Sequence, residues 1–373
     1  MPKVLVTDPI AQDGIDLLSR EAEVDVRLKP ALDELRDLIR DYDALVVRSE
    51  TKVTSEVIEA GKKLQVIGRA GRGVDNIDLD AATHQGIVVV NAPLGNTISA
   101  AEHTIALMLA LARHLPEAHA SLRAGRWERQ QFVGTELRSK TLGLVGLGQV
   151  GMEVARRARA MEMRVVAADP YVAPERAQSL GVELVPFDEL LQQADVISLH
   201  AALTGTSRDL IGEEELAKVK RGVRIINTAR GELIDEAALL RAIDDGRVSG
   251  AAIDVFREEP PGESPLLTHE KVIVTPHLGA STAEAQERVA LDVAEEVLAV
   301  LRGDPARYAV NAPLVSPETM DVLRPFLDVA ERTASLATQL CEGQLQRVEI
   351  EYLGEIANHD VTPLKAAAIK GLL

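Results

Sequence analysis

The sequence predicts an α/β fold built on parallel β-sheets. Short runs rich in valine and isoleucine, such as KVLVTD (Lys3–Asp8) and TLGLVGLG (Thr141–Gly148), recur along the chain. They lack the polar alternation of half-exposed strands, so we expect both faces to be buried, as in a parallel sheet covered by helices. Segments with apolar residues at helical spacing, such as DEAALLRAIDDG, lie between them. Repeated alternation of strand and helix indicates α/β architecture.

The expected strands end in polar side chains. In chain order the runs cover residues 3–8, 43–49, 64–71, 86–93, 141–148, 163–170, 194–201, 222–231, 250–256 and 271–277. Eight of them finish at Arg48, Arg69, Asn91, Asp169, His200, Asn227, Asp254 and His277. In open α/β sheets, ligands bind outside the carboxyl ends of the strands, so this set predicts a ligand-binding cleft.

The pattern changes from about Pro313. Residues 315–340 predict one or two helices, QRVEIEYLG (346–354) predicts a strand, and TPLKAAAIKGLL (362–373) predicts a helix. We therefore expect a partial α+β segment at the C-terminal end of the chain.

Composition excludes several classes of protein. With a net charge of −17 and only 2% aromatic residues, the surface repels nucleic acids and anionic membranes and offers few stacking platforms. The single cysteine, Cys341, cannot form an internal disulfide, and no Cys/His cluster has metal-site spacing. We see no signal peptide and no membrane-spanning run, and expect a cytoplasmic protein without a bound metal.

The most informative stretch follows the strand at 141–148. Gly146-Leu147-Gly148-Gln149-Val150-Gly151 opens a helix, and a second strand ends at Asp169, 18 residues after Gly151. This strand–loop–helix arrangement predicts a dinucleotide site, with the pyrophosphate at the helix N-terminus. Asp169 would accept hydrogen bonds from the adenosine ribose and would repel a 2′-phosphate. We therefore expect NAD(H) rather than NADP(H).

Three later residues complete a chemical pattern. Arg230 lies in NTARGEL, Glu259 in DVFREEP and His277 in TPHLGAS. Together with the glycine-rich loop they resemble the D-isomer-specific 2-hydroxyacid dehydrogenases, in which an Arg, a Glu and a His occur in this order. Oxidation of a 2-hydroxy acid removes a hydride and a proton. Histidine can take the proton, glutamate can orient the imidazole, and arginine can bind the substrate carboxylate.

Longer stretches resemble the phosphoglycerate-oxidising branch of that family: ALVVRSETKVT (44–54), IGRAGRGVDNIDL (67–79) and the segments 89–113, 125–137 and 276–286. The resemblance implies NAD-dependent oxidation of 3-phospho-D-glycerate to 3-phosphohydroxypyruvate, the first step of the phosphorylated serine pathway. Two alternatives remain open: a glyoxylate/hydroxypyruvate or D-lactate type reductase, and an NADH-sensing corepressor-like binding protein.

The resemblance also implies the organisation of the chain. A Rossmann-type NAD domain (93–281) would be inserted in a flavodoxin-like substrate domain (1–92 and 282–310), both doubly wound. Residues 311–373 would begin an intervening domain. Because nothing resembling a serine-binding regulatory domain follows, we expect an incomplete chain that L-serine does not inhibit.

Further site residues follow from the same resemblance. The substrate side would be lined by Arg48, Ser49, Arg69, Gly71, Arg72 and Gly73. The cofactor would also contact Ala201, Thr228, Ala229, Asp254, Gly279 and Ala280. The region Ala100–Arg129 would form a dimer interface, so we expect a homodimer or a dimer of dimers.

Overall fold

The chain forms two compact units in a computed structural model that describes residues 1–312, 317–341 and 347–372. Unit 1 comprises Met1–Pro93 and Glu287–Leu373, and unit 2 comprises Leu94–Gln286. Each unit contains one sheet whose strands all run parallel. The predicted α/β class, with two parallel-sheet domains, is therefore confirmed.

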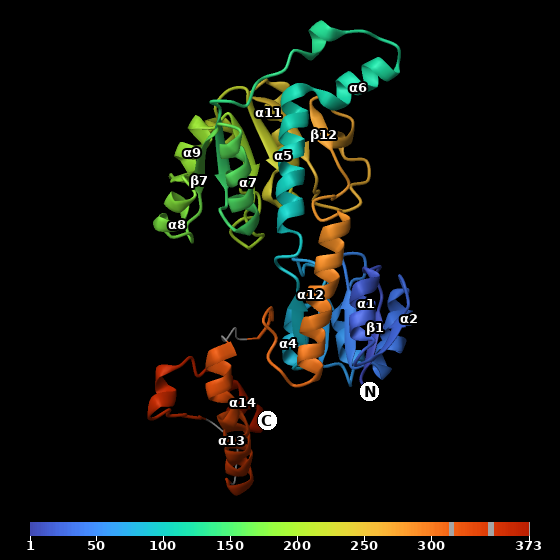
Figure 1. Ribbon diagram of the computed structural model, residues 1–373, viewed down its shortest axis with the longest axis vertical. Helices are drawn as coiled ribbons and strands as arrows, with labels where there is room; N and C mark the ends of the chain where they lie inside the picture. Colours follow the sequence, from blue (N-terminus) through green and yellow to red (C-terminus); the bar gives the residue numbers. More distant parts are fainter. Residues whose placement is uncertain (313–316, 342–346, 373) are drawn as a thin grey trace. The chain divides into compact units, whose positions relative to one another are not determined.

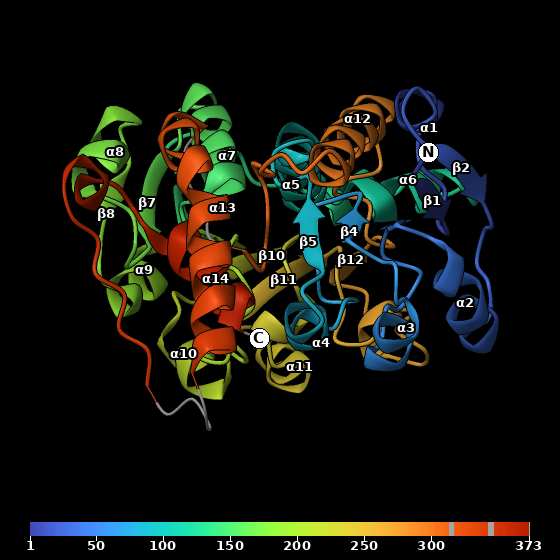
Figure 2. The same ribbon diagram turned by 90° about the horizontal axis from the view of Figure 1, so that it is seen from below.

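Unit 1 is built on a five-stranded sheet of order β2-β1-β3-β4-β5, the flavodoxin-like order. Figure 2 shows β4 and β5 between α12 on one side and α3 and α4 on the other. The strands and helices are β1 (Lys3–Val6), α1 (Gln12–Leu18), β2 (Glu23–Val26), α2 (Leu32–Leu38), η1 (Ile39–Asp41), β3 (Ala44–Val47), α3 (Ser55–Ala60), β4 (Val66–Arg69), α4 (Leu79–His84), β5 (Val88–Asn91) and α12 (Ala283–Leu301).

The continuous apolar runs are explained by burial of both sheet faces. On β1, Val4 and Val6 join a core cluster with Val293 of α12, whereas Leu5 between them joins a second cluster with Leu35 of α2. Successive side chains of a strand point to opposite faces, so a strand covered by helices on both sides needs an apolar residue at every position.

Unit 2 is built on a seven-stranded sheet of order β12-β11-β10-β9-β6-β7-β8. Its elements are α5 (Thr97–Arg113), α6 (Leu115–Arg123), η2 (Arg129–Phe132), β6 (Thr141–Val145), α7 (Gln149–Ala160), β7 (Arg164–Ala168), α8 (Pro174–Ser179), β8 (Glu183–Leu184), α9 (Phe187–Gln193), β9 (Val196–Leu199), α10 (Glu213–Lys218), β10 (Val223–Asn227), η3 (Gly231–Leu233), α11 (Glu236–Asp244), β11 (Val248–Ile253), η4 (Pro265–Leu267) and β12 (Val272–Val274). The central strands follow the Rossmann order. From β6 the sheet continues through β7 and β8 on one side and through β9, β10, β11 and β12 on the other, so the strand order changes direction between β6 and β9. Figure 1 shows α5 beside α7, with which it packs.

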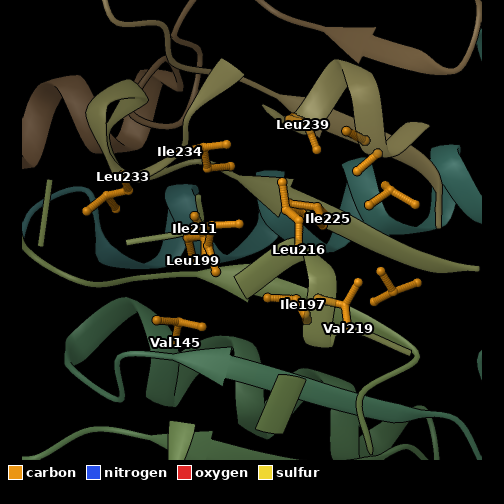
Figure 3. Packing of buried hydrophobic residues seen from close by; sticks show 14 of the residues in the cluster. Val145, Ile197, Leu199, Ile211, Leu216, Val219, Ile225, Leu233, Ile234 and Leu239 are labelled. Atoms are coloured by element: carbon orange, nitrogen blue, oxygen red, sulfur yellow. The ribbon is translucent and has the colours of Figure 1, made fainter. Parts of the chain in front are cut away.

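The core of unit 2 extends to the edge of the sheet where ligands are expected. Figure 3 shows Val145, Leu199 and Ile225 in one apolar cluster with Leu239 of α11. Val145 is the last residue of β6, directly before Gly146, and Leu199 is the last residue of β9. Close packing of these residues holds the turns that follow them in fixed positions.

The C-terminal part forms a helix pair, α13 (Pro317–Leu340) and α14 (Thr362–Leu372). The short helix η5 (Glu355–Asn358) lies between them in the chain. The two helices pack on each other, with Ala334 of α13 and Leu364 and Ala368 of α14 buried. The strand predicted over 346–354 is wrong for the described residues 347–353, which have no strand structure. These residues alternate in polarity but have no neighbouring strand to complete a ladder. No helix among the described residues is long and apolar enough to span a membrane.

A buried carboxylate ties the segment after α12 to unit 1. Glu296 is 1% exposed and accepts hydrogen bonds from the backbone N–H groups of Arg307 (2.6 Å) and Tyr308 (3.1 Å) and from Arg307 Nε (2.9 Å). The following residues pair with β5, where Val310 donates to the carbonyl of Val89. Glu296 therefore fixes the path of the chain after α12 along the sheet of unit 1.

Glu296→Gln should lower the free energy of unfolding by about 2 kcal/mol, because Oε2 accepts from two backbone N–H groups and Oε1 from Arg307 Nε, and glutamine replaces one of these oxygens with an NH₂ group. Glu295→Gln is the matched control, since Glu295 is exposed and contacts only the outer Nη2 of Arg307; it should change stability by less than about 0.5 kcal/mol. Urea denaturation followed by circular dichroism measures both values. Equal stability of the two variants would contradict this interpretation of Glu296.

Candidate active site

The glycine-rich loop turns from β6 into α7 as the sequence predicted. Gly146 has φ +95°, and a Cβ there would lie 2.7 Å from the backbone carbon of His200. A Cβ on Gly151 would lie 2.5 Å from the carbonyl oxygen of Gly146. Both positions therefore require glycine, one for backbone conformation and the other for close approach of helix to turn.

The third glycine leaves space for a ligand. Gly148 is the N-cap of α7, and a Cβ built on it would meet no atom within 4 Å. Unlike Gly146 and Gly151, Gly148 could carry a side chain without a clash with the rest of the protein. A helix N-terminus with an open approach, followed by Gln149 and Val150 in the first turn, suits the pyrophosphate of a dinucleotide.

Asp169 lies directly after β7 and faces this loop. Its Oδ2 accepts a hydrogen bond from the backbone N–H of Leu147 (2.7 Å), and its Oδ1 accepts one from Tyr171 (2.9 Å). An ionised carboxylate has about four lone-pair sites, so acceptor capacity remains for ribose hydroxyls. The residues fit the dinucleotide that the sequence predicted.

The other expected cofactor residues line the same edge of the sheet. They follow successive strands: Ala201 after β9, Thr228 and Ala229 after β10, Asp254 after β11, and Gly279 and Ala280 after β12. Thr228 is held by Thr104 of α5, with 2.8 Å between the two hydroxyl oxygens. All twelve predicted cofactor residues thus belong to unit 2.

His277 and Glu259 form a hydrogen-bonded pair. Nδ1 of His277 lies 2.7 Å from Oε2 of Glu259, whose Oε1 accepts from the backbone N–H of Phe256 (3.2 Å). Burial raises the pKa of Glu259, but the hydrogen bond and charge of His277, with a further contribution from Arg230, bring this pKa below its ordinary value. An ionised Glu259 accepts a hydrogen bond from Nδ1–H of His277, so Nε2 is the ring nitrogen available for proton exchange.

Arg230 follows β10 and is held by its own strand end. Its Nη1 donates to the carbonyl of Ala229 (2.7 Å), and the side chain of Asn227 donates to the carbonyl of Arg230 (2.8 Å). Arg230, Glu259 and His277 follow the neighbouring strands β10, β11 and β12 of the sheet. The three predicted catalytic residues therefore belong to one region of unit 2.

Asp254 organises the turn that carries His277. Its side chain is 0% exposed, Oδ1 accepts from the backbone N–H of Leu278 (2.7 Å) and from Thr275 Oγ1 (2.5 Å), and Oδ2 accepts from the N–H of Gly279 (2.9 Å). Burial raises the pKa of Asp254, yet hydrogen bonds from His103, Thr275 and Leu278 bring it below its ordinary value. Asp254 was predicted as a cofactor contact, and its carboxylate is occupied by protein donors.

The predicted substrate residues lie in unit 1 at the carboxyl ends of β3 and β4. Arg48 and Ser49 follow β3; the backbone N–H of Arg48 donates to Asp8 Oδ2 (2.6 Å), and its Nη1 lies 3.3 Å from the carbonyl of Pro9. Glu50 is the carboxylate nearest to Arg48 in the sequence. In the structure Glu50 pairs with Lys29 instead (2.7 Å).

The remaining four substrate residues form the turn after β4. Arg69 ends the strand, and its guanidinium packs over Gly71. A Cβ on Gly71 would overlap Nη1 of Arg69. Gly71 has φ +151°, a backbone conformation that favours glycine. The carbonyl of Arg72, next to Gly73, accepts from Asn91 Nδ2 (2.6 Å). Three arginines, Arg48, Arg69 and Arg72, therefore belong to one edge of this sheet.

Four supporting residues were missed by sequence reasoning. Asp8 and Asn76 hold the 48–51 loop: Asp8 also accepts from the N–H and hydroxyl of Thr51, and Asn76 donates to the carbonyls of Arg48 and Thr51. His103 and Thr275 contact Asp254. Asp8 was recognisable, because it ends the first strand-like run as Asp254 ends another; His103 carried no local signal.

Family models match two parts of the chain. Residues 105–279 match the D-isomer specific 2-hydroxyacid dehydrogenase NAD binding domain. Residues 322–373 match the D-3-phosphoglycerate dehydrogenase intervening domain, in agreement with the expectation for the C-terminal segment.

Full-length relatives and solved structures agree with these matches. The chain is 52% identical to a D-3-phosphoglycerate dehydrogenase of Synechocystis sp. and 50% identical to one of Methanocaldococcus jannaschii; it aligns over its whole length and covers 68% and 71% of them. A glyoxylate reductase from Paecilomyes thermophila has 35% identity and a TM-score of 0.77, with coverage of 83% of this chain and 98% of that one. The chain therefore belongs to the D-isomer-specific 2-hydroxyacid dehydrogenase family and, within it, to the group that contains these D-3-phosphoglycerate dehydrogenases.

Proposed function

We propose that this chain catalyses the NAD-dependent oxidation of 3-phospho-D-glycerate to 3-phosphohydroxypyruvate. The observation that carries the proposal is the His277–Glu259 pair, at 2.7 Å, in the same unit as the dinucleotide loop. About 50% identity to enzymes named for this reaction supports the substrate. The alternative of a corepressor-like binding module has no support among these relatives.

The proton step falls to His277. NAD, when bound, accepts the hydride from C2 of the substrate. The C2 hydroxyl must lose its proton, and Nε2 of His277 is the nitrogen left open by the hydrogen bond between Nδ1 and Glu259. The imidazolium that results is stabilised by the adjacent carboxylate, whose pKa is held below its ordinary value.

Arg230 is proposed to bind the substrate carboxylate. Its guanidinium presents a planar fork that can donate two parallel hydrogen bonds to a carboxylate. Anchoring the carboxylate beside His277 would direct the C2 hydroxyl towards the imidazole, and this positioning contributes to the rate.

The phosphate is the group that separates this substrate from glyoxylate and D-lactate. A dianion needs compensating cations, since a buried charge without a partner is costly. Unit 1 has Arg48, Arg69 and Arg72 at the end of its sheet, on a chain whose net charge is −17. Local positive charge on so acidic a protein supports an anionic ligand at this edge.

We propose a homodimer formed through α6 and the segment after it. Figure 1 shows α6 and this segment projecting from the body of unit 2. Large apolar side chains are exposed along it: Leu115 is 54%, Leu122 57%, Trp127 75% and Val133 76% exposed. An apolar surface of this kind is typical of a protein–protein interface. Aromatic residues are enriched in interfaces, and Trp127 is one of the few in this chain.

His277→Ala should lower kcat by at least about 100-fold, the usual contribution of a general base, while the Kd for NADH stays within about threefold. Steady-state kinetics with 3-phospho-D-glycerate and calorimetric titration with NADH measure the two effects. His269→Ala is the control, because its ring pairs with the exposed carboxylate of Asp244. Near-normal turnover of His277→Ala would remove this histidine from the mechanism.

Arg48→Ala should lower kcat/KM for 3-phospho-D-glycerate by about 10- to 100-fold, since a charge-assisted hydrogen bond contributes about 1.5–3 kcal/mol. Turnover of unphosphorylated D-glycerate should barely change. Arg40→Ala, which removes a surface arginine paired with Asp37, provides the control. If both substrates lose equally, Arg48 does not bind the phosphate.

Leu122→Glu should convert the dimer to a monomer, because the introduced charge would be desolvated in the interface. Leu32→Glu is the control, at a leucine of similar exposure (51%) on α2 of unit 1. Sedimentation velocity gives the mass of each variant. A Leu122→Glu variant that stays dimeric would place the interface elsewhere.

A further inference from the structure

His103, which is outside the proposed catalytic set, contacts Asp254, the buried carboxylate that holds the turn of His277. His103 lies on α5, and its side chain is 19% exposed. Its Nε2 is 3.1 Å from Asp254 Oδ1 and 3.2 Å from Thr275 Oγ1. Thr275 donates to the same carboxylate oxygen, so the three side chains form one hydrogen-bonded cluster.

This cluster determines the backbone of the turn from Thr275 to Gly279. The N–H of His277 donates to the carbonyl of Asp254 (2.8 Å), and the N–H groups of Leu278 and Gly279 donate to its carboxylate. His277 itself has φ +53°, a conformation uncommon for a residue with a side chain. The turn needs these donors and acceptors in place to hold His277 in that conformation.

The cluster has one partner that does not come from β11 or the β12 turn. Asp254, Thr275, Leu278 and Gly279 all lie at the ends of these two strands. His103 is supplied by α5, which packs across the sheet and contacts β11. It is therefore the side chain that ties the turn to a second, independent element of the fold.

We infer that His103 is a positioning residue for His277, acting through Asp254 and Thr275. Nε2 must carry a proton to donate to the carboxylate, and this holds for the charged ring and for one neutral tautomer. Without that donor, Asp254 loses a hydrogen bond in a fully buried site, and the turn can shift to find another. A shift of about 1 Å at a catalytic base can cost about 100-fold in rate.

Variants of His103 distinguish its role as a hydrogen-bond donor from a role in packing alone. Glutamine can present its amide near the position of the imidazole Nε2, whereas asparagine is shorter and matches Nδ1, which is the wrong end of the ring. His103→Gln should therefore keep the hydrogen bond, and His103→Asn and His103→Leu should lose it. If only volume mattered, leucine and glutamine would behave alike.

The matched control is His269→Leu. His269 has a side-chain exposure of 18%, close to that of His103, and its Nε2 lies 3.3 Å from Asp244. It precedes β12 at the end opposite Thr275. This variant makes the same change in a histidine–aspartate pair at the other end of β12, away from the turn of His277.

The experiment measures kcat and KM with 3-phospho-D-glycerate and NAD, the Kd for NADH, and thermal unfolding for all four variants. His103→Leu and His103→Asn should lose about 10- to 100-fold in kcat, with KM and Kd within about threefold. His103→Gln and His269→Leu should stay within about threefold of the original kcat. A kcat for His103→Leu within twofold of the original, or a loss that glutamine fails to restore, would overturn the inference.

The inference rests on the proposed function, but the two can fail separately. Absence of turnover by the unaltered chain on any 2-hydroxy acid would contradict the proposed function. Crystal structures of the unaltered chain and of His103→Asn then decide the positioning claim without an assay. The residues 277–279 should be displaced in the variant; an unmoved turn would overturn the inference.

Discussion

The conformation of the turn that carries His277 depends on one buried carboxylate. Asp254 has no exposed surface, yet it remains ionised because backbone N–H groups, a hydroxyl and an imidazole all donate to it. Its hydrogen bonds convert the end of a strand into a fixed turn with His277 in a left-handed conformation. Glu259 is hydrogen-bonded to Nδ1 of the imidazole, so one carboxylate holds the backbone of His277 and a second holds its side chain.

Unit 1 uses the same device for a different purpose. Asp8, also 0% exposed, accepts hydrogen bonds from the backbone of Arg48 and Thr51 at the end of the neighbouring strand. In each sheet, a buried aspartate at one strand end fixes a loop that carries a predicted site residue, Arg48 in unit 1 and His277 in unit 2. A parallel sheet makes this arrangement available because its strand ends meet at one edge, with unpaired backbone groups that need partners.

Much of this was predictable because strong local constraints acted on the sequence. Apolar runs without alternation require two covered sheet faces, and Gly146, Gly148 and Gly151 are tied to a strand before and a helix after. His103 was not predictable, since its partner lies 151 residues away and its helix position has no signature of its own. The strand expected at 346–354 failed for a related reason: alternation is local, but a strand exists only beside another.

We propose that this chain oxidises a phosphorylated 2-hydroxy acid, with the His277–Glu259 pair taking up the hydroxyl proton. The most direct test is NADH formation from NAD with 3-phospho-D-glycerate, D-glycerate and D-lactate, each at a range of concentrations. The account predicts a kcat/KM for the phosphorylated acid at least about tenfold above either of the others, the value of one lost charge-assisted contact. Equal or faster oxidation of D-lactate or D-glycerate would contradict it.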